Sequence, residues 1–161
     1  MTRSRGQRGP AELRDASEHL FYELWMLDIV ARILATGAFG DGPVSNALLE
    51  SFSIHARALL QFFFPINPKA DDVLAEDYFA GTEEWERLRG PQPHALEQVN
   101  RRVGKEVAHL TYARLGISEE AKQWRILEIT EALTDVAKRF RASVKTELLS
   151  PQRWRVQEPD A

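Results

Sequence analysis

The sequence predicts an all-α fold, an antiparallel four-helix bundle with a short helical insertion between the second and third long helices. Apolar residues recur at alternating spacings of three and four over four long segments, which is the period of an amphipathic helix. No segment shows the sustained alternation of a half-buried strand, and clusters of glycine and proline separate the segments. Four amphipathic helices joined by loops are typical of such a bundle.

The first two long helices are expected over residues 10–36 and 44–64. Pro10 suits the first turn of a helix, where a missing N–H costs nothing. The turn residues of 37–43 form a loop, and the prolines of 65–68 end the second helix. The two apolar stripes are Leu20, Leu24, Leu27, Val30 or Ala31 and Leu34, and Leu48, Phe52, His55, Leu59 and Phe62 or Phe63.

The insertion follows, with short helices expected over 73–79 and 83–89, the first capped by Asp71 or Asp72. The third long helix is expected over 94–115, and the last over 118–149. Their apolar stripes are Leu96, Val99, Val103, Val107 and Leu110, and Ile126, Ile129, Leu133, Val136, Phe140 and Val144.

One domain accounts for the chain, because 161 residues with 43% hydrophobic content suffice for a single core and are too few for two ordinary ones. Residues 1–9 are expected to be a disordered basic tail, 10–149 the helical domain, and 150–161 a polar C-terminal tail.

Composition narrows the classes of function. A net charge of -3 argues against coating nucleic acid through bulk electrostatics. The absence of cysteine excludes disulfides, thiolate nucleophiles and zinc fingers. With no apolar segment of a signal peptide and no run long enough to span a membrane, we expect a soluble cytoplasmic protein without a cofactor.

The third long helix carries the residues that most resemble a reaction site. Residues seven apart return to nearly the same azimuth of a helix, so Arg102 and His109 should share a face with Glu106 between them. Lys105 lies one turn before His109 on its other flank, and Thr111 and Arg114 follow. This face is either a reaction site or a polar seam inside the bundle.

His55 falls in the apolar stripe of the second helix, and two interpretations stay open. A buried imidazole needs hydrogen-bond partners, so His55 either bonds a polar group on another helix or faces His109 across the bundle. In the second case Arg57, Lys105 and acids of the insertion would complete a polar cluster. Those acids are Asp71, Asp72, Glu76 and Asp77.

A metal centre is the weaker interpretation of that cluster. Glu106 and His109 form one Glu-x-x-His motif, whereas a dimetal bundle needs two. No second copy precedes another histidine, and a single-metal site of His55, His109 and a carboxylate is allowed by residue type alone. We therefore predict no metal.

The segment from Arg102 to His109 also resembles the Arg-x(4–6)-His motif of HEPN domains, which are small α-helical bundles. The resemblance implies a metal-independent endoribonuclease of toxin or defence type, acting as a dimer on RNA and held by a cognate antitoxin protein. Arg102 would then bind the scissile phosphate, and His109 would be the general acid/base on the 2′-hydroxyl, with Lys105 or Arg114 supporting charge. Val103 follows the arginine here, where several members of that family carry a polar residue.

Two further segments, 53–57 and 108–114, are similar to segments of bacterial helical proteins of about this length. That likeness implies no activity. The alternative to a ribonuclease is a non-enzymatic bundle that works through protein contacts, as a homodimer burying an apolar seam of the last helix. In that case His109 should be buried and hydrogen-bonded within its own subunit.

The tryptophans complete the expectations. Trp25 and Trp124 lie in apolar helices and are expected to anchor the core, while Trp85 covers the end of the bundle. Trp154 lies between two arginines and is a candidate docking residue for a second subunit.

Overall fold

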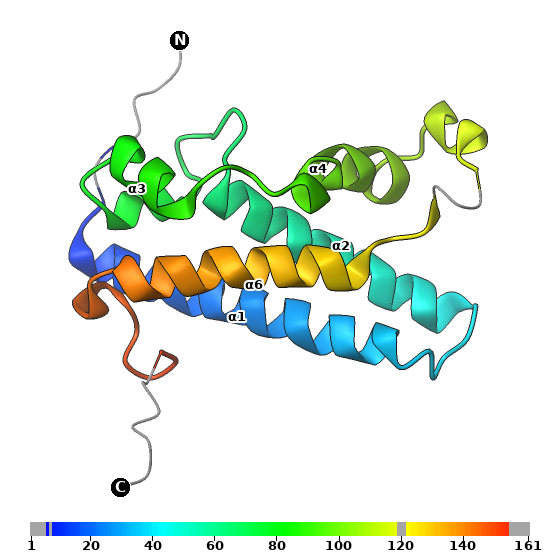
Figure 1. Ribbon diagram of the computed structural model, residues 1–161, viewed down its shortest axis with the longest axis horizontal. Helices are drawn as coiled ribbons and strands as arrows, with labels where there is room; N and C mark the ends of the chain where they lie inside the picture. Colours follow the sequence, from blue (N-terminus) through cyan, green and yellow to red (C-terminus); the bar gives the residue numbers. More distant parts are fainter. Residues whose placement is uncertain (1–5, 7, 119–121, 155–161) are drawn as a thin grey trace, which may run out of the picture.

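The computed structural model describes residues 6, 8–118 and 122–154, and all regular structure in them is helical (Figure 1). Three long helices form its centre: α1 (Pro10–Ala35), α2 (Pro43–Phe63) and α6 (Ile126–Ser143). Helix α1 packs against both others, and it runs in the opposite direction to each (Figure 1). The predicted all-α class is confirmed, and α1 and α2 match their predicted ranges to within a residue.

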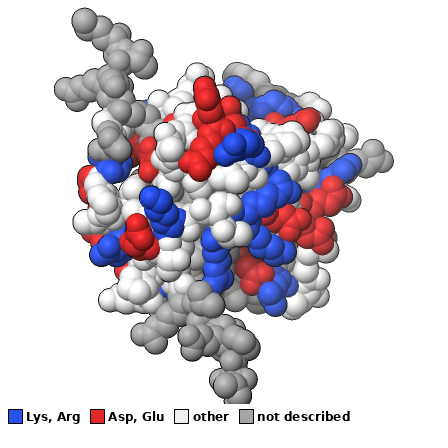
Figure 2. Space-filling view, turned by 60° about the vertical axis from the view of Figure 1, so that its left-hand side comes forward, with Lys and Arg blue, Asp and Glu red and all other residues white. Residues whose placement is uncertain are grey.

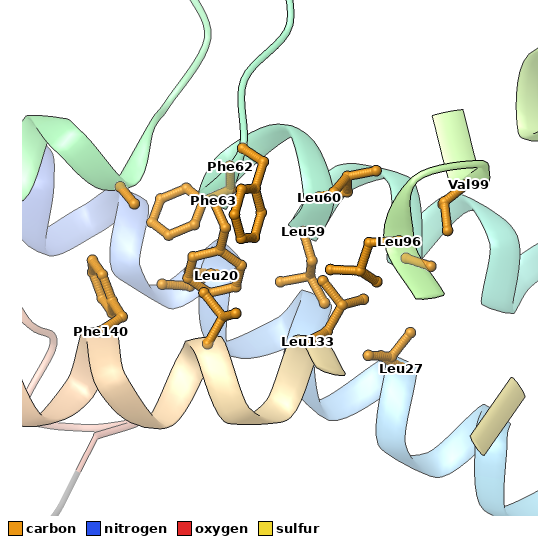
Figure 3. Packing of buried hydrophobic residues seen from close by; sticks show 14 of the residues in the cluster. Leu20, Leu27, Leu59, Leu60, Phe62, Phe63, Leu96, Val99, Leu133 and Phe140 are labelled. Carbon is orange, nitrogen blue, oxygen red and sulfur yellow. The ribbon is translucent and has the colours of Figure 1, made fainter. Parts of the chain in front are cut away.

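The core lies between these helices, with a cluster of aromatic rings at one end (Figure 3). Phe140 of α6 is 1% exposed and contacts five other rings. They belong to Phe62, Phe63, Tyr78, Phe79 and Trp85. The predicted stripe of the last helix is confirmed as core from Ile129 through Val144. That seam is therefore filled by the chain's own residues, and the expected homodimer stays a prediction.

The insertion between α2 and the following segment closes this aromatic end. It contains η1 (Ala75–Tyr78), a 3₁₀ turn, and α3 (Thr82–Arg89). Trp85 of α3 is 1% exposed, stacks on Phe79 at 5.3 Å and donates its indole N–H to the Phe63 carbonyl at 3.0 Å. The insertion thus covers the end of the core, as the sequence indicates for Trp85.

The predicted third long helix is wrong as a continuous helix. The chain forms η2 (His94–Leu96), α4 (Val99–Arg102) and a π-helical turn η3 (Val103–Ala108), and His109 then adopts an extended backbone at φ -128° and ψ 139°. The turn η4 (Tyr112–Gly116) follows. The apolar positions at its start still pack as predicted, because Leu96 and Val99 (Figure 3) and also Val103 are buried.

The break at His109 has a local cause. Gly104 lowers helix stability by about 1 kcal/mol relative to alanine. Where the helix ends, its last carbonyls lack backbone N–H donors, and side chains donate to them instead. The Thr111 hydroxyl donates to the Lys105 carbonyl at 2.9 Å, and the Arg114 guanidinium donates to the carbonyls of Val107 and His109 at 3.3 and 3.0 Å.

Helix α6 is shorter than predicted at both ends, and the chain after it folds back onto α1. Past the turn η5 (Thr146–Leu148), Ser150 is buried and its backbone N–H donates to the Ser17 hydroxyl at 2.8 Å. Trp154 donates to the Ser17 carbonyl at 2.9 Å and meets the Phe21 ring edge-on at 5.8 Å. The helical domain therefore extends to at least residue 154, and Trp154 docks on its own chain.

The predicted tails fall mostly outside the described residues. At the N-terminus, Arg8 donates to the Ala70 carbonyl at 3.0 Å, and Gly9 precedes α1. Residues 1–5, 7 and 155–161 are not described. Within the described part no helix is long and apolar enough to cross a membrane. Figure 2 shows basic and acidic side chains interspersed on the face it presents, in keeping with the small net charge.

Candidate functional site

The structure does not bring Arg102 and His109 together as the sequence predicts. Because the backbone turns to an extended conformation after Ala108, His109 no longer follows Arg102 on a helix face. In the described residues no hydrogen bond or ion pair joins their side chains. His109 is exposed, so the expectation that it is buried and bonded within its own subunit is wrong. Its catalytic role stays a prediction.

Arg102 instead joins the π-helical segment to the chain before α6. Its guanidinium binds both oxygens of Glu106 at 2.8 to 3.1 Å and donates to the carbonyls of Gln123 and Lys122 at 3.0 and 3.2 Å. It also lies 4.3 Å from the centre of the Trp124 ring. Arg102 thus ties the π-helical turn to the residues that directly precede α6.

His55 has the first of its two predicted roles. It is 8% exposed, and its Nδ1 lies 2.7 Å from Glu23 Oε2 on α1. The Tyr22 ring meets the imidazole edge-on at 5.8 Å. The alternative, in which His55 faces His109 across the bundle, is wrong because His109 is on the exposed segment after η3.

The other members of the predicted polar cluster are dispersed. Arg57 is exposed on α2. Asp72 accepts from the Lys69 backbone N–H at 2.7 Å, in the turn before η1. Thr111 and Arg114 bind backbone carbonyls around the break, as described above. Only Lys105 is both exposed and beside Arg102, on the edge of a cleft.

That cleft, which we call the Trp124 cleft, has a volume of about 530 Å³ and lies between α4, η3 and the start of α6. Val99, Ile117, Trp124 and Ile129 contribute apolar surface. Its charged lining consists of Arg101, Arg102, Lys105, Arg125 and the single carboxylate of Glu106, and His94 also lines it. Since Arg102 neutralises Glu106, the remaining charges make the cleft basic.

Two further hollows meet at the same tryptophan. One, of about 260 Å³, lies against Leu49 and Glu50 of α2, and another, of about 340 Å³, lies against Leu34 of α1. Trp124 lines all three spaces. Its indole is partly buried, so the prediction of a core anchor holds in part, but the surrounding end of the molecule is not filled.

Large apolar side chains project from the segment beside these hollows. Leu110, Tyr112 and Leu115 are 93%, 92% and 85% exposed. The Thr111 and Arg114 bonds to backbone carbonyls fix the segment that carries them. Apolar surface of this kind is costly to leave in water. The three side chains belong to the segment whose Arg114, Gly116 and Ile117 line the hollows.

The Glu-x-x-His motif of the sequence is not presented as a pair of ligands. Among the described residues, no group of three or more His, Asp or Glu side chains is placed to hold a metal ion. Glu106 is bound by Arg102, and His109 lies past the end of the π-helical turn. The Glu-x-x-His spacing therefore does not correspond to one helix face.

Sequence reasoning missed the Trp124 cleft and the role of Arg102. The spacing of four between Arg102 and Glu106 is a typical helical ion-pair spacing and is the signal that could have indicated their pairing. The cleft itself leaves no local pattern, because its walls come from segments distant in the chain.

Comparisons with protein-family models, with curated proteins and with solved structures found no match to this chain. Its function is therefore inferred from the geometry of its own residues.

Proposed function

We propose that the chain is a protein-interaction module whose Trp124 cleft binds an acidic segment of a partner protein, with the apolar side chains of that segment packed against Leu110, Tyr112 and Leu115. The observation that carries the proposal is the exposure of these three side chains, 85% to 93%, on a segment fixed beside the cleft. Apolar and aromatic anchors of this kind dominate the energy of protein interfaces.

The charge of the cleft supports an acidic occupant. Arg101 and Lys105 are exposed on its edge, and Arg125 pairs with Glu128 at 3.2 Å in a bond with both side chains largely in solvent. Cations at a rim mainly raise the association rate and select against basic partners. A partner segment carrying both carboxylates and apolar side chains would complement both parts of the site.

A fluorescence-anisotropy titration with labelled model peptides tests the proposal. The probe is a short amphipathic peptide with leucines on one face and glutamates on the other. Two variants of it replace all glutamates with lysine, or all leucines with serine. We expect the acidic amphipathic peptide to bind most tightly, with an affinity that falls as salt is added.

Matched variants of the protein locate the binding. Leu110→Ser should weaken binding, whereas Ile66→Ser, which changes a 57% exposed side chain in the loop after α2, should not. Lys105→Glu should weaken it by roughly fivefold, the effect of losing about 1 kcal/mol at an exposed ion pair. Lys138→Glu on α6 is its control. Equal binding of the acidic and lysine peptides, or equal loss in control and test variants, would refute the proposal.

A further inference from the structure

Helix α1 carries a second apolar stripe on the side opposite its core stripe. Leu13, Leu20, Leu27 and Ala31 face the core. Tyr22, Trp25 and Ile29 recur at spacings of three and four and are 47%, 50% and 37% exposed. The prediction that Trp25 anchors the core is therefore wrong. A helix that is apolar on opposite sides is normally covered on both.

Charges flank this outer stripe symmetrically. Glu18 lies seven residues before Trp25 and Arg32 seven residues after it, so both lie near its azimuth, each about 10.5 Å along the helix axis. The described bonds of Arg32, to both carboxylate oxygens of Asp28 at 2.9 Å, use its Nε, and its side chain is 75% exposed. The described bond of Glu18, from Ser150, uses Oε1.

From this pattern we infer that a second copy of the chain covers the stripe, with the two α1 helices packed antiparallel about a two-fold axis near Trp25. In that arrangement Glu18 of each copy lies opposite Arg32 of the other, and Tyr22 lies within one residue of the position opposite Ile29. The surface is thus self-complementary, because opposite charges face each other and apolar side chains face apolar side chains, as a two-fold interface requires. Ile54 of α2, 57% exposed and next to the His55 that contacts Tyr22, extends the apolar surface.

The interface is distinct from the Trp124 cleft. The cleft is lined by α4, η3, the segment before α6 and α6, whereas the stripe is on the outer side of α1. The α1 dimer and peptide binding at the Trp124 cleft can therefore be refuted independently. Variants of the stripe should bind the acidic peptide as the wild type does.

Sedimentation velocity on the full chain, over a range of concentrations, tests the inference. The wild type should form a dimer, and Trp25→Glu should raise the dissociation constant by about thirtyfold or more, as expected on losing a central aromatic anchor. Phe39→Glu is the matched control, because Phe39 is equally exposed at 52% but lies in the loop after α1. Circular dichroism confirms that each variant is folded.

Charge reversal tests the antiparallel register. Glu18→Arg and Arg32→Glu should each weaken the dimer, because each places like charges opposite one another across the two-fold axis. The doubly reversed variant restores opposite charges and should recover most of the affinity. A monomeric wild type, a dimer that survives Trp25→Glu, or a doubly reversed variant as weak as the single ones would overturn the inference.

Discussion

Replacing Arg102 with methionine should destabilise the protein strongly. The two side chains of its ion pair with Glu106 are only 13% and 15% exposed, so removing Arg102 leaves a largely buried carboxylate without its partner. Loss of one partner of a fully buried pair costs about 3 to 5 kcal/mol. Partial exposure lowers that figure, while the lost contact with Trp124 adds to it. We expect a decrease of about 3 kcal/mol in the free energy of unfolding.

Urea unfolding followed by circular dichroism measures this decrease. Lys138→Met is the matched control, because Lys138 makes a helical ion pair with Asp135 in solvent, and exposed pairs contribute about 0.5 kcal/mol or less. The double variant Arg102→Met with Glu106→Leu should recover part of the loss, since it also removes the stranded carboxylate. An Arg102→Met protein as stable as the control would refute the stabilising role derived for this residue.

The same proteins separate stability from catalysis. His109 is exposed, and its only described hydrogen bond is through its carbonyl, so His109→Ala should unfold like the wild type. If the ribonuclease prediction is right, this variant loses an RNA cleavage that the wild type shows in the presence of a chelator. If the wild type and His109→Ala show the same background cleavage of mixed RNA, the ribonuclease prediction is refuted.

Three further outcomes follow from the packing. Phe140→Ala should cost about 3 to 5 kcal/mol in urea unfolding, because its ring is enclosed by aromatic neighbours, whereas Phe39→Ala in the loop after α1 should cost less than about 0.5 kcal/mol. Burial raises the pKa of the Tyr78 hydroxyl. Its contribution to the free energy of unfolding is therefore complete below the unfolded pKa of about 10 and is lost as pH rises above that value. Tyr78→Phe should reduce this loss of stability at alkaline pH. Trp154→Ala should lower the unfolding free energy by about 1 to 3 kcal/mol and leave the oligomeric state unchanged, and a lost dimer would instead place Trp154 between subunits.

The predictions that succeeded depend on sustained apolar periodicity. Helices α1 and α2 carry uninterrupted stripes next to glycine or proline and match their predicted ranges. The stripe of α6 is buried as predicted, although that helix is shorter than expected. The same periodicity placed Leu110 in the core, yet it is 93% exposed. Periodicity depends only on the spacing of apolar residues. It gives no sign that the Arg114 guanidinium donates to the carbonyls of Val107 and His109, which would accept from backbone N–H groups in a longer helix.

Trp25 shows a different kind of error. Its apolar character suggested the core, but its azimuth is nearly opposite that of Leu20 and Leu27, so the helical geometry already placed it on the outer side. The Trp124 cleft could not be foreseen in this way, because α4, the π-helical turn and the start of α6 are brought together only by the complete fold.

The contact between Ser17 and Ser150 spans 133 positions of the chain, and it determines when folding can finish. At synthesis rates of roughly 5 to 20 residues per second, the first helix waits on the order of ten seconds after it leaves the ribosome before its final neighbours exist. Throughout that interval, the surface of the first helix that residues 126–154 later cover is exposed to solvent and to other nascent chains.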